Sequence, residues 1–535
     1  MLSPILAATA LNTWPFIVLL ISVATVIIGI SVVRLHPFLA LILAALLAGC
    51  IAGSLPSDPK APEKSQLVRA VEITAEGFGK TAGGVAIIIG MATIIGMCLM
   101  ESGAADKVVR RFLAVCGTKP AGVSFAIVLS TYILSIPIFF DSMFMLMIPI
   151  AVAMALRTGR DFALYVMAIC AGGVITHALT IPHPGPIFMA ENLGIDVGVS
   201  IWVGIVAGAI PMVVGWLACQ FLNKKFPVSV RETASLPLAD ARAMMEKPES
   251  SLPGFTASLL PIIVPIALIS LSSVFEVVKQ SDDKARKAAL APVAAQGTGT
   301  TTSAPAQPTP VPVSTPAIAA GGAAPSGLAS STVAAFGSRD SFLKVKGVID
   351  FVGNKNIALV IGAVLSLWLL KRQRGLSMNR IGEMVGPPLE TAGVIILITS
   401  AGGAFGYMLT QCGVGDSLAV WAKSQQGINL VFLGFLVSFV FRVAQGSATV
   451  AMQTTSAMFI ALLPNLPCHP LYLFLAIGFG ATGFSWMNDS GFWVVSRLSG
   501  FTEKETLKTW TLLLSIIAIT GITMTMILST VMPLK

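Results

Sequence analysis

The sequence carries little charge for its length. Only 11% of its 535 residues are Asp, Glu, Lys or Arg, whereas 55% are hydrophobic and the mean hydropathy is +0.85. A soluble domain needs far more charge to cover its surface, so this composition excludes a soluble globular protein. The charged residues lie in short patches between long apolar runs, which is the pattern of a chain that crosses a membrane several times.

Residues that hold metals or carry out redox chemistry are also scarce. The seven cysteines form no CxxC pair and no cluster with histidine, and the four histidines are widely scattered, so we expect no metal and no other cofactor. No Walker A sequence is present, so the chain itself is not expected to hydrolyse ATP. The net charge of +9 does not predict nucleic acid binding, because the basic residues flank apolar spans.

Ten apolar stretches approach or exceed the length that a helix needs to cross a bilayer. They are 14–33, 37–55, 81–101, 162–186, 200–222, 256–276, 356–371, 384–411, 471–493 and 510–531. Two more, 120–157 and 428–463, are too long for one crossing and are interrupted by polar residues near their middle. We interpret each of these two as a re-entrant helical hairpin, which enters and leaves on the same side of the membrane.

The positions of lysine and arginine favour this interpretation. If the N-terminus is outside and both hairpins are re-entrant, the basic patches at 107–119, 157–160, 224–231, 371–380 and 497–508 all fall on the cytoplasmic side. That is the bias expected for short loops, whereas ordinary spans would divide these patches between the two sides. We therefore expect a multi-pass protein of the inner (plasma) membrane with its N- and C-termini outside.

The two halves of the chain resemble each other. Residues 96–106, GMCLMESGAAD, match residues 406–416, GYMLTQCGVGD, and four identical pairs share a separation of 310 positions. In each half the match is followed by a hairpin and then by a span that helix-unfriendly residues interrupt, at 176–186 and at 483–493. Because the first hairpin is predicted to open to the cytoplasm and the second to the outside, the repeat is inverted, which is typical of secondary transporters.

The predicted fold class is thus an all-α polytopic membrane protein with two inverted repeats, each with a re-entrant helical hairpin and a broken transmembrane helix. Residues 1–36 form an N-terminal transmembrane helix, 37–230 the first repeat, 231–280 a linker and a transmembrane helix, and 341–535 the second repeat. Residues 281–340 are rich in Ala, Pro, Thr, Ser and Gly. We expect this insert to be disordered, because it cannot bury enough apolar area to fold.

In the first half, polar residues gather at the hairpin and at the broken span: Asp141, Ser142, Thr176, His177, His183 and Gly185. An ionisable group deep in a membrane is costly unless it is paired or hydrated, and it usually serves function. Asp141 is therefore a candidate for proton or cation coupling or for accepting a substrate hydroxyl; the alternatives are a helix cap and a structural ion pair. His183 is a candidate proton carrier, and a structural hydrogen bond in the bend is its alternative.

In the second half, the hairpin turn carries Arg442, Gly446, Ser447 and Thr449, and the broken span carries Asn488 and Asp489. The returning half-helix begins at this turn, so its N-terminus could hold a carboxylate, with Ser447 and Thr449 adding hydrogen bonds. The alternatives are that these hydroxyls only cap the helix and that Arg442 reaches a membrane interface. Asp489 could balance Arg442, bind a cation or accept substrate hydroxyls, and the sequence leaves this choice open.

Together these groups suit a hydroxylated carboxylate better than an apolar solute or a bare ion. We expect them to bind such a substrate, with Asp141, His183 and Asp489 as candidates for proton coupling. An enzyme would need a nucleophile with its base or a metal cluster, and no spacing supports either. A channel would favour a symmetric oligomeric filter, whereas this repeat supplies a site within one chain.

Four motifs resemble the gluconate permease (GntP) family, the gluconate:proton symporters. They are FFDSMFMLMIPIA at 139–151, THALTIPHPGP at 176–186, FRVAQGSATVA at 441–451 and WMNDSGFW at 486–493. The resemblance covers nearly the whole chain except the 281–340 insert. It implies a bacterial inner-membrane importer of gluconate or a related sugar acid, coupled to protons, with kinship to the ion-transporter superfamily, two hairpins and an elevator-like motion.

The resemblance leaves the substrate and the coupling ion open. Family members often carry Glu where this chain has Asp141, and the family also includes D-serine, idonate and fructuronate carriers. Sodium in place of protons is an alternative. We expect a small anionic substrate, protons and the lipid bilayer as partners, no nucleic acid, and we leave open a homo-oligomer.

Overall fold

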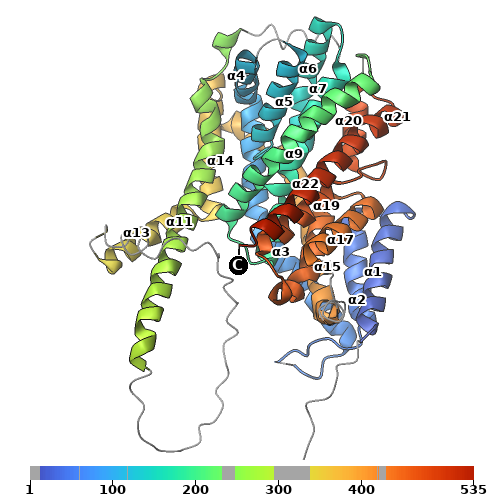
Figure 1. Ribbon diagram of the computed structural model, residues 1–535, viewed down its shortest axis with the longest axis vertical. Helices are drawn as coiled ribbons and strands as arrows, with labels where there is room; N and C mark the ends of the chain where they lie inside the picture. Colours follow the sequence, from blue (N-terminus) through green and yellow to red (C-terminus); the bar gives the residue numbers. More distant parts are fainter. Residues whose placement is uncertain are drawn as a thin grey trace, which may run out of the picture.

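The computed structural model describes residues 12–59, 61–116, 119–231, 248–294, 336, 338–417, 420 and 429–534. Within these ranges the regular elements are helices, and the one strand-like pairing is an isolated bridge between Asp58 and Ala61. In the same ranges, seven helices are long and apolar enough to cross a membrane. The predicted all-α polytopic fold is therefore confirmed (Figure 1).

The long helices agree with predicted apolar stretches and often extend beyond them. They are α3 (Gln66–Glu101), α9 (Val197–Lys225), α11 (Phe255–Ala294), α14 (Lys355–Arg374), α15 (Met378–Gln411) and α22 (Leu512–Val531), which continues α21 (Glu503–Thr506) and η3 (Leu507–Thr511). Shorter helices are α1 (Trp14–Ser31), α2 (Pro37–Ile51) and α4 (Ala104–Cys116). The start of α3 was predicted at 81; the helix begins earlier because the Ser65 hydroxyl caps it by accepting from the backbone N–H of Val68.

Both stretches interpreted as hairpins are two helices joined by a short turn. The first hairpin is α5 (Pro120–Leu134) and α6 (Phe140–Thr158), and the second is α17 (Leu430–Gln445) and α18 (Ala448–Phe459), which is followed by η2 (Ile460–Asn465). In Figure 1, α5 and α6 lie toward the upper end of the molecule and α17 lies lower down, near α15. The opposite membrane orientation of the two halves, and with it the position of the termini, stays a prediction.

Both broken spans are interrupted where the sequence indicated. The first is α7 (Phe162–Leu179) followed by α8 (Pro184–Asn192), and the second is α19 (Pro470–Thr482) followed by α20 (Ser490–Ser499). Almost every residue of α7 and every residue of α19 is buried, so these two helices form the centre of the molecule. They approach closely at Gly478, where a Cβ would lie 3.0 Å from the carbonyl oxygen of Ala178.

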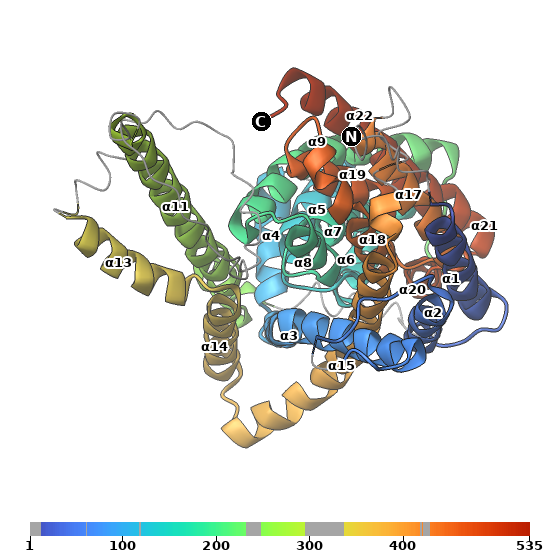
Figure 2. The same ribbon diagram turned by 90° about the horizontal axis from the view of Figure 1, so that it is seen from below.

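The two helices in which the matching repeat segments begin, α3 and α15, lie side by side (Figure 2). Small residues allow their close approach, since a Cβ on Gly77 would lie 2.9 Å from the Cβ of Tyr407. On another face, α15 packs on α18, and a Cβ on Gly406 would lie 2.6 Å from the Cβ of Ala457. The helix α15 thus connects α3 with the second hairpin.

The edges of the 281–340 insert differ from the prediction. The helix α11 runs through the expected boundary to Ala294, and α13 (Arg339–Val352) already begins at 339. The prediction of disorder is thus wrong for 281–294 and 339–340, while residues 295–335 and 337 lie outside the described part of the chain. Figure 2 shows α11 and α13 together, projecting away from the other helices.

Ion pairs between α11 and α13 explain these longer helices. Arg339 pairs with Asp282 at 3.6 Å and with Asp283, and Lys346 pairs with Glu276 at 2.7 Å. Rings of Phe275, Phe336 and Phe342 pack together beside them. Composition alone misses these ion pairs, because they join residues more than fifty positions apart. We call this set of contacts the α11–α13 clasp.

Candidate functional site

The turn of the second hairpin combines a glycine in the left-handed region with a capped helix start. Gly446 ends α17 with φ +85°, and the Ser447 hydroxyl accepts a hydrogen bond of 3.3 Å from the backbone N–H of Val450. Ser447 therefore caps α18, as the structural alternative proposed. Thr449 lies in the first turn of α18 and is half-buried, so both residues are at the positive end of this half-helix.

A buried ion pair joins this turn to the second broken span. Arg442 on α17 donates from Nη2 to Oδ2 of Asp489 and from Nη1 to the carbonyl oxygen of Gly446. The two residues are only 4% and 7% exposed. Arg442 therefore does not reach a membrane interface, and Asp489 balances its charge.

The break between α19 and α20 is held against the same turn. Asn488 Nδ2 and Trp486 Nε1 donate to the carbonyl oxygen of Val443 at 2.8 and 3.0 Å. The Asp489 carboxylate also caps α20, accepting from the Gly491 backbone N–H at 3.1 Å. Arg442, Gly446, Ser447, Asn488 and Asp489 thus lie together, and we call them the polar site.

A hydroxyl that the sequence left without a role completes the surroundings of Asp489. Ser485 donates to the carboxylate of Asp489, and its oxygen accepts from Trp510 Nε1 at 2.6 Å. The hydroxyl of Thr511 donates to the Ser485 carbonyl at 2.5 Å. The end of η3, just before α22, thereby fixes the orientation of the carboxylate that pairs with Arg442.

Replacing Ser485 with alanine should lower the free energy of unfolding by about 1–3 kcal/mol, because the buried Trp510 N–H and one Asp489 oxygen each lose a partner. Thermal denaturation of the purified protein would measure this loss. Ser490→Ala is the matched control, since Ser490 is exposed and should change stability little. Equal stability of Ser485→Ala and wild type would contradict this view of the network.

Asp141 of the first hairpin lies close to this network. It stands in the first turn of α6, is exposed, and lies within electrostatic range of Asp489. The ring of the preceding Phe140 packs on Trp510 with centroids 5.3 Å apart. The neighbouring Ser142 is half-buried. The hairpin of the first half and the broken helix of the second half therefore meet.

The histidines of the first broken span form a pair. The rings of His177 and His183 lie 4.6 Å apart, and Nε2 of His183 is 2.6 Å from the carbonyl oxygen of Ser135 in the turn of the first hairpin. Two other residues predicted to bind substrate, Thr176 and Gly185, make their contacts within the protein. Thr176 is buried and donates to the carbonyls of its own helix, and Gly185 packs under Met452 of α18.

Sequence reasoning passed over Gln453. Both polar atoms of its amide are buried without a partner in the described ranges, as are the hydroxyls of Thr454 and Thr455. The four consecutive polar residues QTTS at 453–456, inside an apolar hairpin, were the available signal. Among the described residues, no group of three or more His, Cys, Asp or Glu side chains could hold a metal ion.

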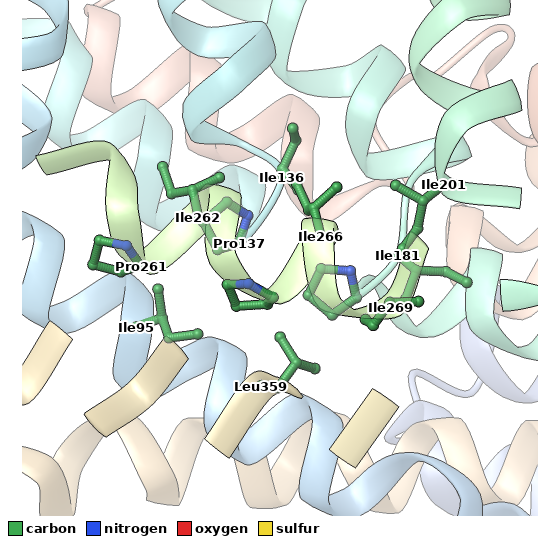
Figure 3. Close-up of a pocket in the computed structure, with 12 residues that line it drawn as sticks. Ile95, Ile136, Pro137, Ile181, Ile201, Pro261, Ile262, Ile266, Ile269 and Leu359 are labelled. Atoms are coloured by element: carbon green, nitrogen blue, oxygen red, sulfur yellow. The ribbon is translucent and has the colours of Figure 1, made fainter. Parts of the chain in front are cut away.

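An apolar pocket adjoins the two turns of the first half. Figure 3 shows Ile136 and Pro137 of the hairpin turn and Ile181 of the broken span facing α11, α3 and α14. The pocket contains none of the polar site residues. It borders the hairpin turn with apolar side chains and offers no side-chain hydrogen bonds to a polar solute.

Helix breaks that bring charged side chains together inside an apolar helical protein define a membrane transport protein, because unwound backbone is tolerated at membrane depth only where it is buried in protein or lines a water-filled path. The chain belongs to the GntP family of permeases, whose family model matches residues 14–296 and 328–531. It is accordingly a multi-pass membrane transporter.

Relatives along nearly the full length agree with this assignment. The inner membrane permease YgbN of Escherichia coli K12 is 31% identical, over 92% of this chain and 93% of its own. A gluconate permease of Pseudomonas aeruginosa is 27% identical, over 96% and 97%. The D-serine transporter DsdX of Escherichia coli K12 is 28% identical, over 95% and 97%.

Two solved transporters share the fold. MtrF of Neisseria gonorrhoeae, from a class of antimetabolite efflux pumps, has a TM-score of 0.56 at 14% identity and covers 92% of this chain and 94% of its own. The YdaH transporter of Alcanivorax borkumensis has a TM-score of 0.54 at 12% identity, over 93% and 99%.

Proposed function

We propose that the chain is a proton-coupled secondary active transporter that imports gluconate or a related sugar acid across the bacterial inner membrane. The observation that carries this proposal is the meeting of three helix breaks. The buried Arg442–Asp489 pair, the capped start of α18 and the exposed Asp141 gather cationic, hydroxyl and carboxylate groups in one region. Such a set can bind a carboxylate and the hydroxyls of the same small molecule.

The proposed binding mode follows from these positions. The substrate carboxylate lies at the start of α18, where the helix end is positive and Thr449 is accessible. Substrate hydroxyls meet Asn488 and Asp489, whose oxygens can accept. The Oδ1 atom of Asn488 is buried and without a partner in the described ranges, which supports a hydrogen bond to a bound solute.

The runner-up is a carrier of the D-serine type. Both gluconate permeases and a D-serine transporter are among the relatives at similar identity, and a zwitterion would use the same helix start for its carboxylate and Asp141 for its ammonium group. Sodium instead of protons is the alternative for coupling. Uptake of labelled gluconate and of labelled D-serine into proteoliposomes, with a pH or a sodium gradient imposed separately, distinguishes these cases.

Neutralising Asp141 tests the proposed site. Asp141→Asn should reduce pH-driven gluconate uptake by about 10–100-fold while the protein stays folded, because Asp141 is exposed and makes no hydrogen bond among the described residues. Initial uptake rates in proteoliposomes measure the effect. Glu63→Gln, which neutralises an exposed carboxylate before α3, is the control and should transport normally. Unchanged uptake by Asp141→Asn would remove Asp141 from the site, and wild-type uptake that ignores the pH gradient would refute proton symport.

A further inference from the structure

The two central histidines of the first half are brought together by the helix break. His177 lies in the last turn of α7, and His183 immediately precedes α8. In a continuous helix, residues six positions apart point in different directions. Here the chain folds back at 180–183, and the two rings lie 4.6 Å apart at an interplanar angle of 58°. The two rings can therefore touch only because the helix is interrupted between them.

The geometry also determines which ring nitrogen of His183 carries the hydrogen. Its Nε2 lies 2.6 Å from the carbonyl oxygen of Ser135, and a carbonyl can only accept, so Nε2 must carry the hydrogen. In the neutral ring, Nδ1 is then a bare acceptor. The Nδ1 atoms of both histidines and the hydroxyl of Ser135 are buried and have no partner within the described residues. Unpartnered polar atoms on three residues that contact one another in turn, Ser135 with His183 and His183 with His177, indicate a site that takes up something small, and a proton is the smallest candidate.

The two members of the pair differ in how far they are buried. His177 is half-buried, whereas His183 is 2% exposed. The ring of Phe139 packs on His183 at 5.5 Å. Beyond the same turns lies the apolar pocket of Figure 3, with Ile136 next to Ser135 in the chain. A proton can therefore reach His183 most directly through His177.

Few other charges face the pair. Arg442 on α17 acts electrostatically on His177, and Asp489 forms an ion pair with Arg442. Asp141 stands in the first turn of α6, two positions after Phe139. Tyr132 on α5 donates its hydroxyl to the Ile205 carbonyl at 2.6 Å.

Other helices packed near the pair add few ionisable side chains. Glu191 at the far end of α8 pairs with Lys355, and the sequence of α18 contains no ionisable side chain. The same is true of α22, while the ionisable side chains of α9 and α19 are Cys219, Lys224, Lys225 and Tyr472.

We propose that His177 and His183 together hold the one proton that is co-transported. Two imidazolium rings in contact would repel each other strongly in this buried setting, so the pair takes up a single proton. An anion bound beside Arg442 offsets the positive field on His177 and favours that proton, and by linkage the proton favours the anion. This inference rests on the proposed proton symport and deepens it by naming the proton carriers.

Replacing each histidine with glutamine tests the pair in proteoliposomes with labelled gluconate. In His183→Gln, the side-chain amide nitrogen can still donate toward the Ser135 carbonyl, so this variant should fold while no longer titrating. We expect His183→Gln and His177→Gln to lose about tenfold or more of pH-driven accumulation but to keep counterflow exchange, which needs no net proton movement. His36→Gln, at an exposed histidine, is the control and should retain both. Coupled accumulation that survives in both variants would overturn the inference, as would equal loss of counterflow.

A second measurement separates failure of the inference from failure of the proposed function. With only four histidines, 15N-histidine NMR of the purified protein can follow each ring. We expect His183 to carry its hydrogen on Nε2 at neutral pH and the pair to bind one proton on acidification. A hydrogen on Nδ1, or uptake of two protons, would contradict the inference even if transport is proton-driven. Wild-type uptake indifferent to pH, with the NMR result as expected, would refute the proposed symport and the transport of this proton, but would leave the pair as a site that binds a single proton.

Discussion

Arg442→Gln should destabilise the protein by about 3–5 kcal/mol and abolish gluconate uptake. The guanidinium is buried and is the cationic partner of Asp489, so glutamine leaves a buried carboxylate without its counter-charge. The substitution also removes the hydrogen bond that holds the Gly446 carbonyl at the hairpin turn. Thermal denaturation of the purified protein, followed by uptake in proteoliposomes, measures both effects.

The double variant Arg442→Gln/Asp489→Asn separates loss of charge balance from loss of a ligand. It removes both charges, so most of the stability should return, while uptake should stay low because the positive charge proposed to favour an anionic substrate beside the start of α18 is still missing. Stability as low as in the single variant would mean that the ion pair is not what holds the turn. Normal uptake by the double variant would exclude both residues from substrate binding.

Gly446→Ala should cost about 2–4 kcal/mol of stability and reduce uptake to background. Gly446 has φ +85°, which L-residues rarely adopt, and a Cβ would lie 2.1 Å from the Asn488 carbonyl oxygen. Either the second hairpin or the second broken helix must move, and both carry residues of the polar site. The same two measurements, denaturation and uptake, apply.

Gly413→Ala is the matched control for this prediction. Gly413 has φ +74°, but a Cβ at this position would meet no atom within 4 Å, so alanine there brings the backbone strain without the clash. We expect a loss of about 1–2 kcal/mol and retained uptake. If both variants behaved alike, left-handed strain alone would account for the loss, and the contact with Asn488 would be unimportant.

The sequence predicted the helix breaks well because their causes are local. Pro182 and Pro184 flank His183, so the first span cannot continue as a helix, and Asn488, Asp489 and Gly491 are poor helix formers in the second. The breaks then place Arg442 beside Asp489, one of the choices that the sequence left open. Capping by Ser447, also left open, follows equally local rules.

What the sequence could not give are contacts between distant elements. Trp510 comes from η3, and nothing near Ser485 in the chain indicates it as the hydrogen-bond donor. The pairing of His177 with His183 depends on how sharply the break folds, which residue types do not specify. Likewise, the helical edges of the insert depend on Arg339 meeting Asp282 and Asp283 across a long segment.

The α11–α13 clasp affects how the length of the chain between these two helices can vary during evolution. Because Arg339 meets Asp282 and Asp283, the segment from 284 to 338 departs from and returns to one point on the molecule. Closing a longer loop between fixed ends adds only about 0.6 kcal/mol for each doubling of its length. A change in the number of residues between Asp283 and Arg339 should therefore cost little stability, and it leaves the helices that carry the polar site in place.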